Sequence, residues 1–160
     1  MAKILVADDE RSIQILLSEL LKKDDHTVIA ASDGTEACRF IAQDGFDLVV
    51  TDLHMAAKGG IDVLKEAKKS DPFLEVLILT GYGTISSAVE AMQLGAFEYL
   101  TKPLDLQEFR LKVKQALELR QMRQKIAQQQ EELQAHQEMI AKDLKLAAQV
   151  QTLSLIHISE

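Results

Sequence analysis

The stretch KILVADDE, residues 3–10, joins a short apolar run to three consecutive acidic residues. A run of this length, rich in Ile, Leu and Val, predicts a buried β-strand. Carboxylates that lie side by side repel one another, so Asp8, Asp9 and Glu10 at the end of such a strand need a cation nearby. The rest of the sequence has to account for both the strand and its acidic end.

Four further runs rich in β-forming residues follow the first. They are TVIAA (27–31), DLVVTD (47–52), EVLILT (75–80) and EYLTK (98–102). Between the runs, apolar residues recur at helical spacing, as in Ile13, Leu16, Leu17, Leu20 and Leu21. Strands that alternate with crossover helices pair in parallel, and continuously apolar strands have both faces covered. The pattern therefore predicts an α/β fold with a doubly wound parallel sheet.

Polar residues stand at the ends of these strands. In doubly wound sheets, ligands bind beyond the carboxyl ends of the strands. Asp8 and Asp9 end the first strand, and Asp52 ends the third. Three carboxylates offer the oxygen ligands that Mg²⁺ prefers, so these residues are a candidate metal site.

Two further strand ends supply groups that suit phosphate chemistry. Thr80 ends the fourth strand with a hydroxyl, and Lys102 ends the fifth with a positive charge. Both groups can stabilise the oxygens of a phosphoryl group in transfer. A carboxylate can act as the covalent nucleophile, and Asp52, which stands alone at a central strand end, is the best candidate.

Four motifs closely resemble the receiver domain of bacterial two-component response regulators, in the CheY-like superfamily. They are VADDE, LVVTDLHM followed by Gly60, LILTGYG, and GAFEYLTKPLDLQEF, and the resemblance covers about residues 1–120. It implies a flavodoxin-like (βα)5 fold with strand order 2-1-3-4-5. It also implies Mg²⁺-dependent (or Mn²⁺-dependent) phosphoryl transfer to Asp52 from a sensor histidine kinase or a phosphotransfer protein.

The resemblance also implies roles for individual residues. Asp8 and Asp9 would bind the metal with Asp52 and the backbone carbonyl of His54. Thr80 would turn toward the phosphoryl group, and Lys102 matches the lysine of the family's site.

Further roles concern switching and the lifetime of the phosphoryl group. Thr80 and Tyr99 would be the switch residues, acting on the surface of the fourth helix, fifth strand and fifth helix. Side chains at His54 and Tyr82 would tune the loss of the phosphoryl group, although His54 is equally well interpreted as a bystander. The Lys102–Pro103 bond is expected to be cis, which costs little before proline. Ala56 departs from the family, which usually has proline there.

Residues 105 to about 153 contain no Gly and no Pro, which predicts one long helix. Leu119, Ile126, Leu133, Ile140 and Ala147 recur every seven residues, as on one side of a coiled-coil seam. The partner positions are Met122, Gln129, His136, Asp143 and Val150. The polar middle predicts a homodimer of modest strength; a solitary solvated helix is the alternative, and a phase shift near Leu144 leaves the register open.

Three segments are expected along the chain. These are a receiver domain at 1–120, a helical coiled-coil linker at 121–155 that continues the fifth helix, and a tail at 156–160 from truncation or non-native sequence. The stretch DLKLAAQVQTLSL (143–155) is similar to linkers that precede PP2C-type, SpoIIE-like phosphatase domains, and linkers to cyclase domains look alike at this length. We therefore expect a regulator that catalyses only its own phosphoryl transfer and dephosphorylation, with its output domain absent from this sequence.

Composition excludes several classes of protein. A net charge of −7 and a pI near 5.1 provide no basic face, so direct nucleic-acid contact is not expected. No apolar run reaches the roughly 18 residues that a membrane span needs. The single cysteine, Cys38, excludes an internal disulfide and a thiolate metal cluster. These features favour a cytoplasmic protein.

Two other functions compete with the regulator. One is a free-standing Mg²⁺-dependent phosphatase with an aspartyl-phosphate intermediate, for which Asp8 and Glu10 have the nucleophile and acid spacing. The other is a scaffold that acts without phosphorylation, which the set of polar strand-end residues argues against.

Overall fold

The computed structural model describes residues 1–81 and 84–158, with side chains up to residue 151. The chain divides into two compact units, Met1–Gln121 and Met122–Glu160. The first unit holds the sheet, and the second is formed by the later part of the last helix.

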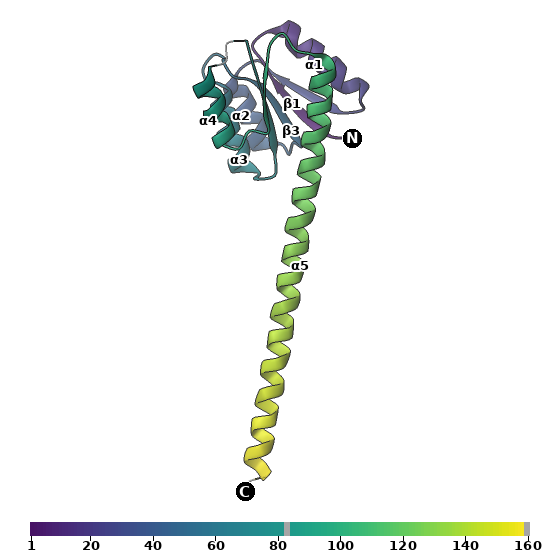
Figure 1. The fold of residues 1–160 in the computed structure, drawn as a ribbon, viewed down its shortest axis with the longest axis vertical. Coiled ribbons are helices and arrows are strands. Elements are labelled where there is room, and N and C mark those ends of the chain that lie inside the picture. Colours follow the sequence, from purple (N-terminus) through teal and green to yellow (C-terminus); the bar gives the residue numbers. More distant parts are fainter. Residues whose placement is uncertain (82–83, 159–160) are drawn as a thin grey trace. The chain divides into compact units, whose positions relative to one another are not determined.

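The first unit is built on a five-stranded parallel sheet with strand order β2-β1-β3-β4-β5 (Figure 1). The strands are β1 (Lys3–Ala7), β2 (Thr27–Ala31), β3 (Leu48–Asp52), β4 (Glu75–Thr80) and β5 (Glu98–Thr101). The predicted fold class and the order 2-1-3-4-5 are confirmed. The order places β1 and β3 side by side at the centre, so the residues that follow these two strands are neighbours.

Five helices connect and cover the strands. They are α1 (Arg11–Lys23), α2 (Gly34–Gln43), α3 (Gly60–Ser70), α4 (Ile85–Gln93) and α5 (Leu106–Ile158). Local sequence explains where several begin: Asp33 accepts a hydrogen bond from the Glu36 N–H at 2.8 Å, and Thr84 and Ser87 form a capping box at α4. α5 continues beyond the predicted end near residue 153, so residues 156–158 of the expected tail are helical.

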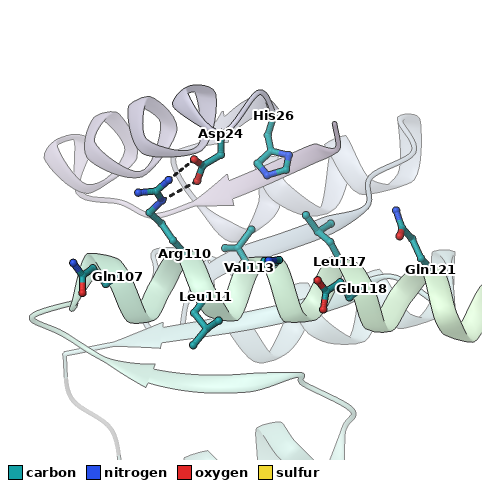
Figure 2. Close-up of a pocket in the computed structure, with 10 residues that line it drawn as sticks. Asp24, His26, Gln107, Arg110, Leu111, Val113, Leu117, Glu118 and Gln121 are labelled. Carbon is teal, nitrogen blue, oxygen red and sulfur yellow. Dashed lines mark hydrogen bonds and ion pairs between the residues drawn. The ribbon is translucent and has the colours of Figure 1, made fainter.

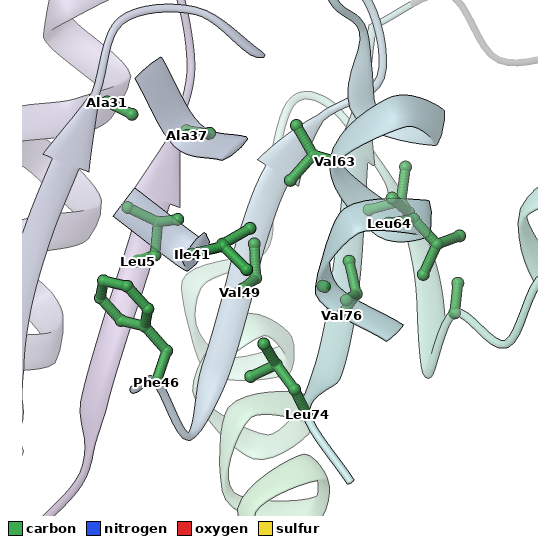
Figure 3. Packing of buried hydrophobic residues seen from close by; sticks show 14 of the residues in the cluster. Leu5, Ala31, Ala37, Ile41, Phe46, Val49, Val63, Leu64, Leu74 and Val76 are labelled. Atoms are coloured by element: carbon green, nitrogen blue, oxygen red, sulfur yellow. The ribbon is translucent and has the colours of Figure 1, made fainter. Parts of the chain in front are cut away.

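Alternation of side chains along the strands produces two hydrophobic cores. Leu5, Val49 and Val76 belong to the core beneath α2, α3 and α4, where Ile41 lies beside Leu5 and Val49 (Figure 3). The other face packs on α1 and α5 through the following residues: Ile4, Val6, Leu48, Val50, Leu77, Leu79, Leu17, Leu21, Phe109, Val113 and Ala116. Both faces of the sheet are thus covered, as the continuous apolar runs predicted.

Arg120 ties α5 to the edge of the sheet at which the strands begin. Its side chain is 11% exposed; Nε lies 3.3 Å from Asp47 Oδ1 and Nη1 lies 2.9 Å from Asp71 Oδ2. Asp47 also accepts a hydrogen bond from the Lys3 N–H, and Asp71 accepts one from the Phe73 N–H. One guanidinium group therefore connects α5 to the segments that lead into β1, β3 and β4. We call this group of contacts the Arg120 clamp.

Two strand boundaries differ from the prediction by one residue. β3 begins at Leu48 rather than Asp47, although the Asp47 N–H and side chain both bond to the Lys3 backbone. β5 ends at Thr101 rather than Lys102. The Lys102 N–H still donates to the Thr80 carbonyl at 2.7 Å, but Pro103 has no N–H to continue the ladder.

The second unit consists of α5 from Met122 onward, and its side chains are exposed almost throughout the described part, to residue 151. Large apolar side chains are among them: Met122, Ile126, Leu133, Met139, Ile140, Leu144, Leu146 and Val150. Among the described residues, no helix has the length and apolar character to span a membrane.

Candidate functional site

Parallel strands bring the predicted site residues to one edge of the sheet. Asp8 follows β1, Asp52 ends β3, Thr80 ends β4 and Lys102 follows β5. Asp8 is 1% exposed, Thr80 is fully buried, and Asp52 is 7% exposed. Residues far apart in sequence therefore form one compact polar cluster on an otherwise apolar sheet.

Lys102 lies at the centre of this cluster. Its Nζ lies 2.9 Å from Asp8 Oδ2, 3.4 Å from Asp52 Oδ2 and 3.8 Å from Glu10 Oε1. The ammonium group thus relieves the repulsion between carboxylates that the sequence places at neighbouring strand ends.

The acidic residues after β1 fit a hard cation. Carboxylate oxygens of Asp8, Asp9 and Glu10 lie within 4.8 Å of one another. Asp52 is outside this group of oxygens, and its side chain lies beside Lys102 instead. Glu10, the N-cap residue of α1, is a neighbour of the cluster with a 60% exposed side chain. An oxygen-only set of this kind suits Mg²⁺, Mn²⁺ or Ca²⁺.

Burial dominates the electrostatics of the two buried carboxyl groups. Desolvation raises the pKa of Asp8, although the hydrogen bond from Lys102 acts in the opposite direction. Desolvation also raises the pKa of Asp52, against the charge of Lys102 and a hydrogen bond from the His54 backbone. For Lys102, burial lowers the pKa, but Asp8, Asp52 and Glu10 together outweigh burial and raise it. The ammonium group is therefore held in its charged form, while burial makes the charged form of both carboxyl groups less favourable than in water.

Glycines let the backbone after β3 pack closely. A Cβ on Gly60 would lie 2.5 Å from the Asp52 carbonyl oxygen and 3.0 Å from Leu53 Cα. A Cβ on Gly34 would collide with the Lys58 backbone. The loop also holds Ala57 at a φ of 65°, a conformation that L-residues rarely adopt. The segment between β3 and α3, which carries His54 and Ala56, is therefore closely packed at Lys58 and Gly60.

The comparisons with known proteins agree with this geometry. Residues 4–114 match the family described as the response regulator receiver domain. This chain belongs to that family. The receiver is 36% identical over 115 residues to sporulation initiation phosphotransferase F of Bacillus subtilis, covering 72% of this chain and 93% of that protein.

Other relatives are longer, and solved receivers share the fold. The chain is 41% identical over 114 residues to the transcriptional regulatory protein ZraR of Klebsiella oxytoca, covering 71% of this chain but 26% of that protein. A Clostridium thermocellum receiver domain superposes with a TM-score of 0.72 at 40% identity, covering 76% and 98% of the two chains. The Thermotoga maritima response regulator TrrA, solved in complex with Mg²⁺ and BeF, superposes at 0.67 with 32% identity, covering 73% and 100%. The chain thus spans about a quarter of the length of ZraR.

The predicted switch residues lie on the neighbouring strands β4 and β5, where Tyr99 pairs with Ile78, two residues before Thr80. Thr80 ends β4, while Tyr99 of β5 is partly buried against the core beneath α4. The Tyr99 hydroxyl lies 3.3 Å from Ser87 Oγ, and Ser87 also closes the capping box with Thr84. Tyr99 is therefore connected to the first turn of α4. The expected cis bond between Lys102 and Pro103 is present.

Two residues were predicted to tune the lifetime of the phosphoryl group. His54 is exposed and follows Asp52 by two positions. Tyr82 lies outside the described residues.

Gln14 of α1 is a site neighbour that sequence reasoning missed. Its Nε2 donates to the Asp8 carbonyl oxygen at 2.5 Å. Asp8 Oδ1 accepts a hydrogen bond from the Glu10 N–H at 2.9 Å. The turn between β1 and α1 is thus fixed by hydrogen bonds to both the backbone and the side chain of Asp8. Helical periodicity gives no signal for Gln14, because the contact depends on how the turn folds back.

A surface groove of about 510 Å³ lies away from the acidic cluster, between α5 and the connection from α1 to β2 (Figure 2). Asp24 and Arg110 form a two-point ion pair at its rim, with Arg110 Nε 2.9 Å from Asp24 Oδ2. Val113 and Leu117 line its wall beside His26. The polar strand-end cluster of the receiver is therefore separate from this groove.

Proposed function

We propose that this receiver accepts a phosphoryl group on Asp52 in a Mg²⁺-dependent reaction. The observation that carries the proposal is the position of Lys102, whose Nζ lies 2.9 Å from Asp8 and 3.4 Å from Asp52. A carboxylate and an ammonium group lie side by side at the carboxyl ends of the strands. They provide a nucleophile and a positive charge that stabilises the transferred group. Asp52 retains 7% exposure, so a donor has access to it.

The donor we propose is a phosphohistidine of a sensor histidine kinase or phosphotransfer protein. An Asp52 carboxylate oxygen forms the new bond to phosphorus as the phosphorus–nitrogen bond to the donor histidine breaks. Lys102 and the Thr80 hydroxyl stabilise the phosphoryl oxygens. The similarity to a protein named sporulation initiation phosphotransferase F supports this chemistry.

Asp8, Asp9, Asp52 and the His54 carbonyl are the proposed metal ligands. Mg²⁺ or Mn²⁺ would supply charge that neutralises the phosphoryl oxygens. The cluster of carboxylate oxygens after β1 supports the assignment, and Glu10 adds a further negative charge at its rim. The relative solved with Mg²⁺ and BeF supports the choice of metal.

The test is labelling with acetyl phosphate, followed by intact mass. Wild type should be labelled with Mg²⁺ and unlabelled with EDTA, and Asp52→Asn should remain unlabelled in both. Asp25→Asn is the matched control, because Asp25 is exposed, lies before β2, and has a φ of 65° that Asn also tolerates. Persistent labelling of Asp52→Asn would refute the proposed acceptor.

The phosphatase and the scaffold are less well supported. The family match is to response regulators, and Glu10 lies 3.8 Å from Lys102 rather than facing an enclosed substrate pocket among the described residues. A phosphatase would turn over an external phosphate ester many times per chain. A scaffold would not be labelled at all.

The signal we propose passes through Thr80 and Tyr99 to the surface of α4, β5 and α5. The hydrogen bond between the Tyr99 and Ser87 hydroxyls supports this route, because a shift of Tyr99 would break its link to the first turn of α4. The helix beyond Gln121 would form a homodimer, and a change in its geometry would pass the signal to an output domain. The output domain we propose is a PP2C-type phosphatase. We place this regulator in the cytoplasm, without direct nucleic-acid contact, given its net charge of −7.

A further inference from the structure

The helix beyond Gln121 carries an apolar stripe that nothing in the described part of the chain covers. Met122, Ile126, Leu133 and Ile140 lie on this stripe and are 45–58% exposed. From Ile126 onward the stripe repeats every seven residues, so in coiled-coil terms Ile126, Leu133 and Ile140 occupy a positions and Met122 a d position. A stripe with this period fits a second helix of the same period, and a second copy of this chain supplies one.

The polar residues of the stripe distinguish parallel from antiparallel pairing. In a parallel, in-register pair, each a residue faces itself, so Ile126, Leu133 and Ile140 form apolar layers. Gln129 and His136 occupy the intervening d positions and also face themselves. In an antiparallel pair centred on the same segment, a faces d, so Ile126 would face His136 and Leu133 would face Gln129. That arrangement buries each polar group against an apolar one, which is costly.

Charges beside the stripe favour the same arrangement. Parallel pairing brings position g of one helix beside position e of the next heptad in the other helix. Lys125 then lies beside Gln130, and Glu132 beside Gln137, so no like charges meet. The antiparallel alternative places Glu132 opposite its own copy.

Building on the proposed function, we propose that Met122–Ile140 pairs in parallel register with the same segment of a second copy, and that Gln129 and His136 keep this pairing weak enough for the receiver to control it. Two of the central layers are polar, so they contribute less than Leu layers would. Asp143 follows at the next d position, where two like charges would meet, and limits the pairing on that side.

Sedimentation equilibrium of the full chain tests whether the Gln129 and His136 layers weaken the dimer. Gln129→Leu with His136→Leu should tighten the dimer dissociation constant by at least about tenfold. Gln128→Leu with Gln134→Leu is the matched control, because these exposed residues bond along the helix to Glu132 and Glu138 and lie outside the stripe. No tightening by the first pair, or equal tightening by both pairs, would overturn the assignment.

Disulfide formation tests the register. In a Cys38→Ala background, Leu133→Cys should form a disulfide-linked dimer much faster than Gln134→Cys under mild oxidation. Antiparallel pairing predicts instead that Leu133→Cys cross-links to Gln129→Cys in a mixture of the two variants and not to itself.

Beryllofluoride tests control by the receiver. The wild-type dissociation constant should change on addition of beryllofluoride and Mg²⁺, whereas the Gln129→Leu, His136→Leu chain should stay dimeric in both states. An unchanged wild-type constant, with Asp52 still labelled by acetyl phosphate, would refute control of the pairing. If Asp52 is not labelled, the proposed function fails. The effect of Gln129→Leu with His136→Leu on the dimer dissociation constant still shows whether the stripe pairs as proposed.

Discussion

Lys102 and Asp8 are 94 residues apart in sequence, yet Lys102 Nζ lies 2.9 Å from Asp8 Oδ2. The contact joins the ends of β1 and β5 across the intervening β3 and β4, and Nζ also lies 3.4 Å from Asp52 at the end of β3. In the absence of metal, this ammonium group is the nearest positive charge that the structure shows for both carboxylates among its described residues. Its removal should therefore affect stability and chemistry together.

Lys102→Met should lower the rate of labelling by acetyl phosphate on the order of 10²-fold, as loss of a preorganised charge does at other sites of this kind. It should also lower the melting temperature in EDTA, because two buried carboxylates lose their cation, and Mg²⁺ should restore part of that loss. Lys114→Met is the control, since Lys114 is exposed on α5. Equal labelling rates for Lys102→Met and wild type would contradict the role we give Lys102.

Asp52→Asn should stabilise the metal-free protein at neutral pH. Burial raises the pKa of Asp52 above its ordinary 3.8, so the folded state binds the proton more tightly than the unfolded state. Stability from this group is present below pH 3.8 and is lost as the pH rises through the raised pKa. Urea unfolding in EDTA should therefore show wild type weakening over that window relative to Asp52→Asn. If Asp52→Asn is less stable than wild type at pH 7, burial is not the dominant influence on the pKa of Asp52.

Gly60→Ala should destabilise the protein by about 1–3 kcal/mol, as other overpacked sites do. The added Cβ would lie 2.5 Å from the Asp52 carbonyl oxygen, so the backbone that carries the acceptor must move. Labelling should slow for the same reason. Gly45→Ala is the matched control, because a Cβ there meets nothing within 4 Å. Similar losses in both variants would mean that the close approach at Gly60 is unimportant.

Arg120→Met should cost about 1.5–3 kcal/mol of unfolding free energy, the range for hydrogen bonds to charged groups. The lower part of the range is expected, because the side chains of Asp47 and Asp71 are 41% and 33% exposed and regain water. Arg110→Met removes an exposed ion pair with Asp24 and should cost less. Chemical denaturation of the three proteins measures the difference, and a larger loss for Arg110→Met would contradict it.

The strands followed from sequence because strand formation here depends on local residues, whereas their order followed from the resemblance to receiver domains. The runs at 3–7, 27–31 and 75–80 match the structure at both ends. Of the two boundaries that differ, the one at Lys102 is set by the adjacent Pro103, and the one at Asp47 coincides with a contact to the distant Lys3. Periodicity reports which residues are buried and carries no information about such partners.

The candidate site was predictable in its members and not in its arrangement. Topology alone brings Asp8, Asp52 and Lys102 to one edge, so strand-end positions were enough to choose them. The division between Asp52 and the other carboxylates was not foreseen: oxygens of Asp8, Asp9 and Glu10 lie within 4.8 Å of one another and Asp52 is outside that group, although Lys102 contacts both Asp8 and Asp52. Side-chain rotamers decide that division, and a sequence pattern does not report them.

The Arg120 clamp lies at the edge of the sheet opposite the acidic cluster. Asp47 lies directly before β3, which ends in Asp52, and Asp71 lies shortly before β4, which ends in Thr80. At about 3.3 Å per residue, the two ends of β3 are only some 15 Å apart. Asp47, which contacts Arg120, and Asp52, the proposed acceptor, thus stand at opposite ends of one short strand. The same two strands that present Asp52 and Thr80 thus hold α5 at Arg120, the last buried residue of α5 within the described part of the first unit.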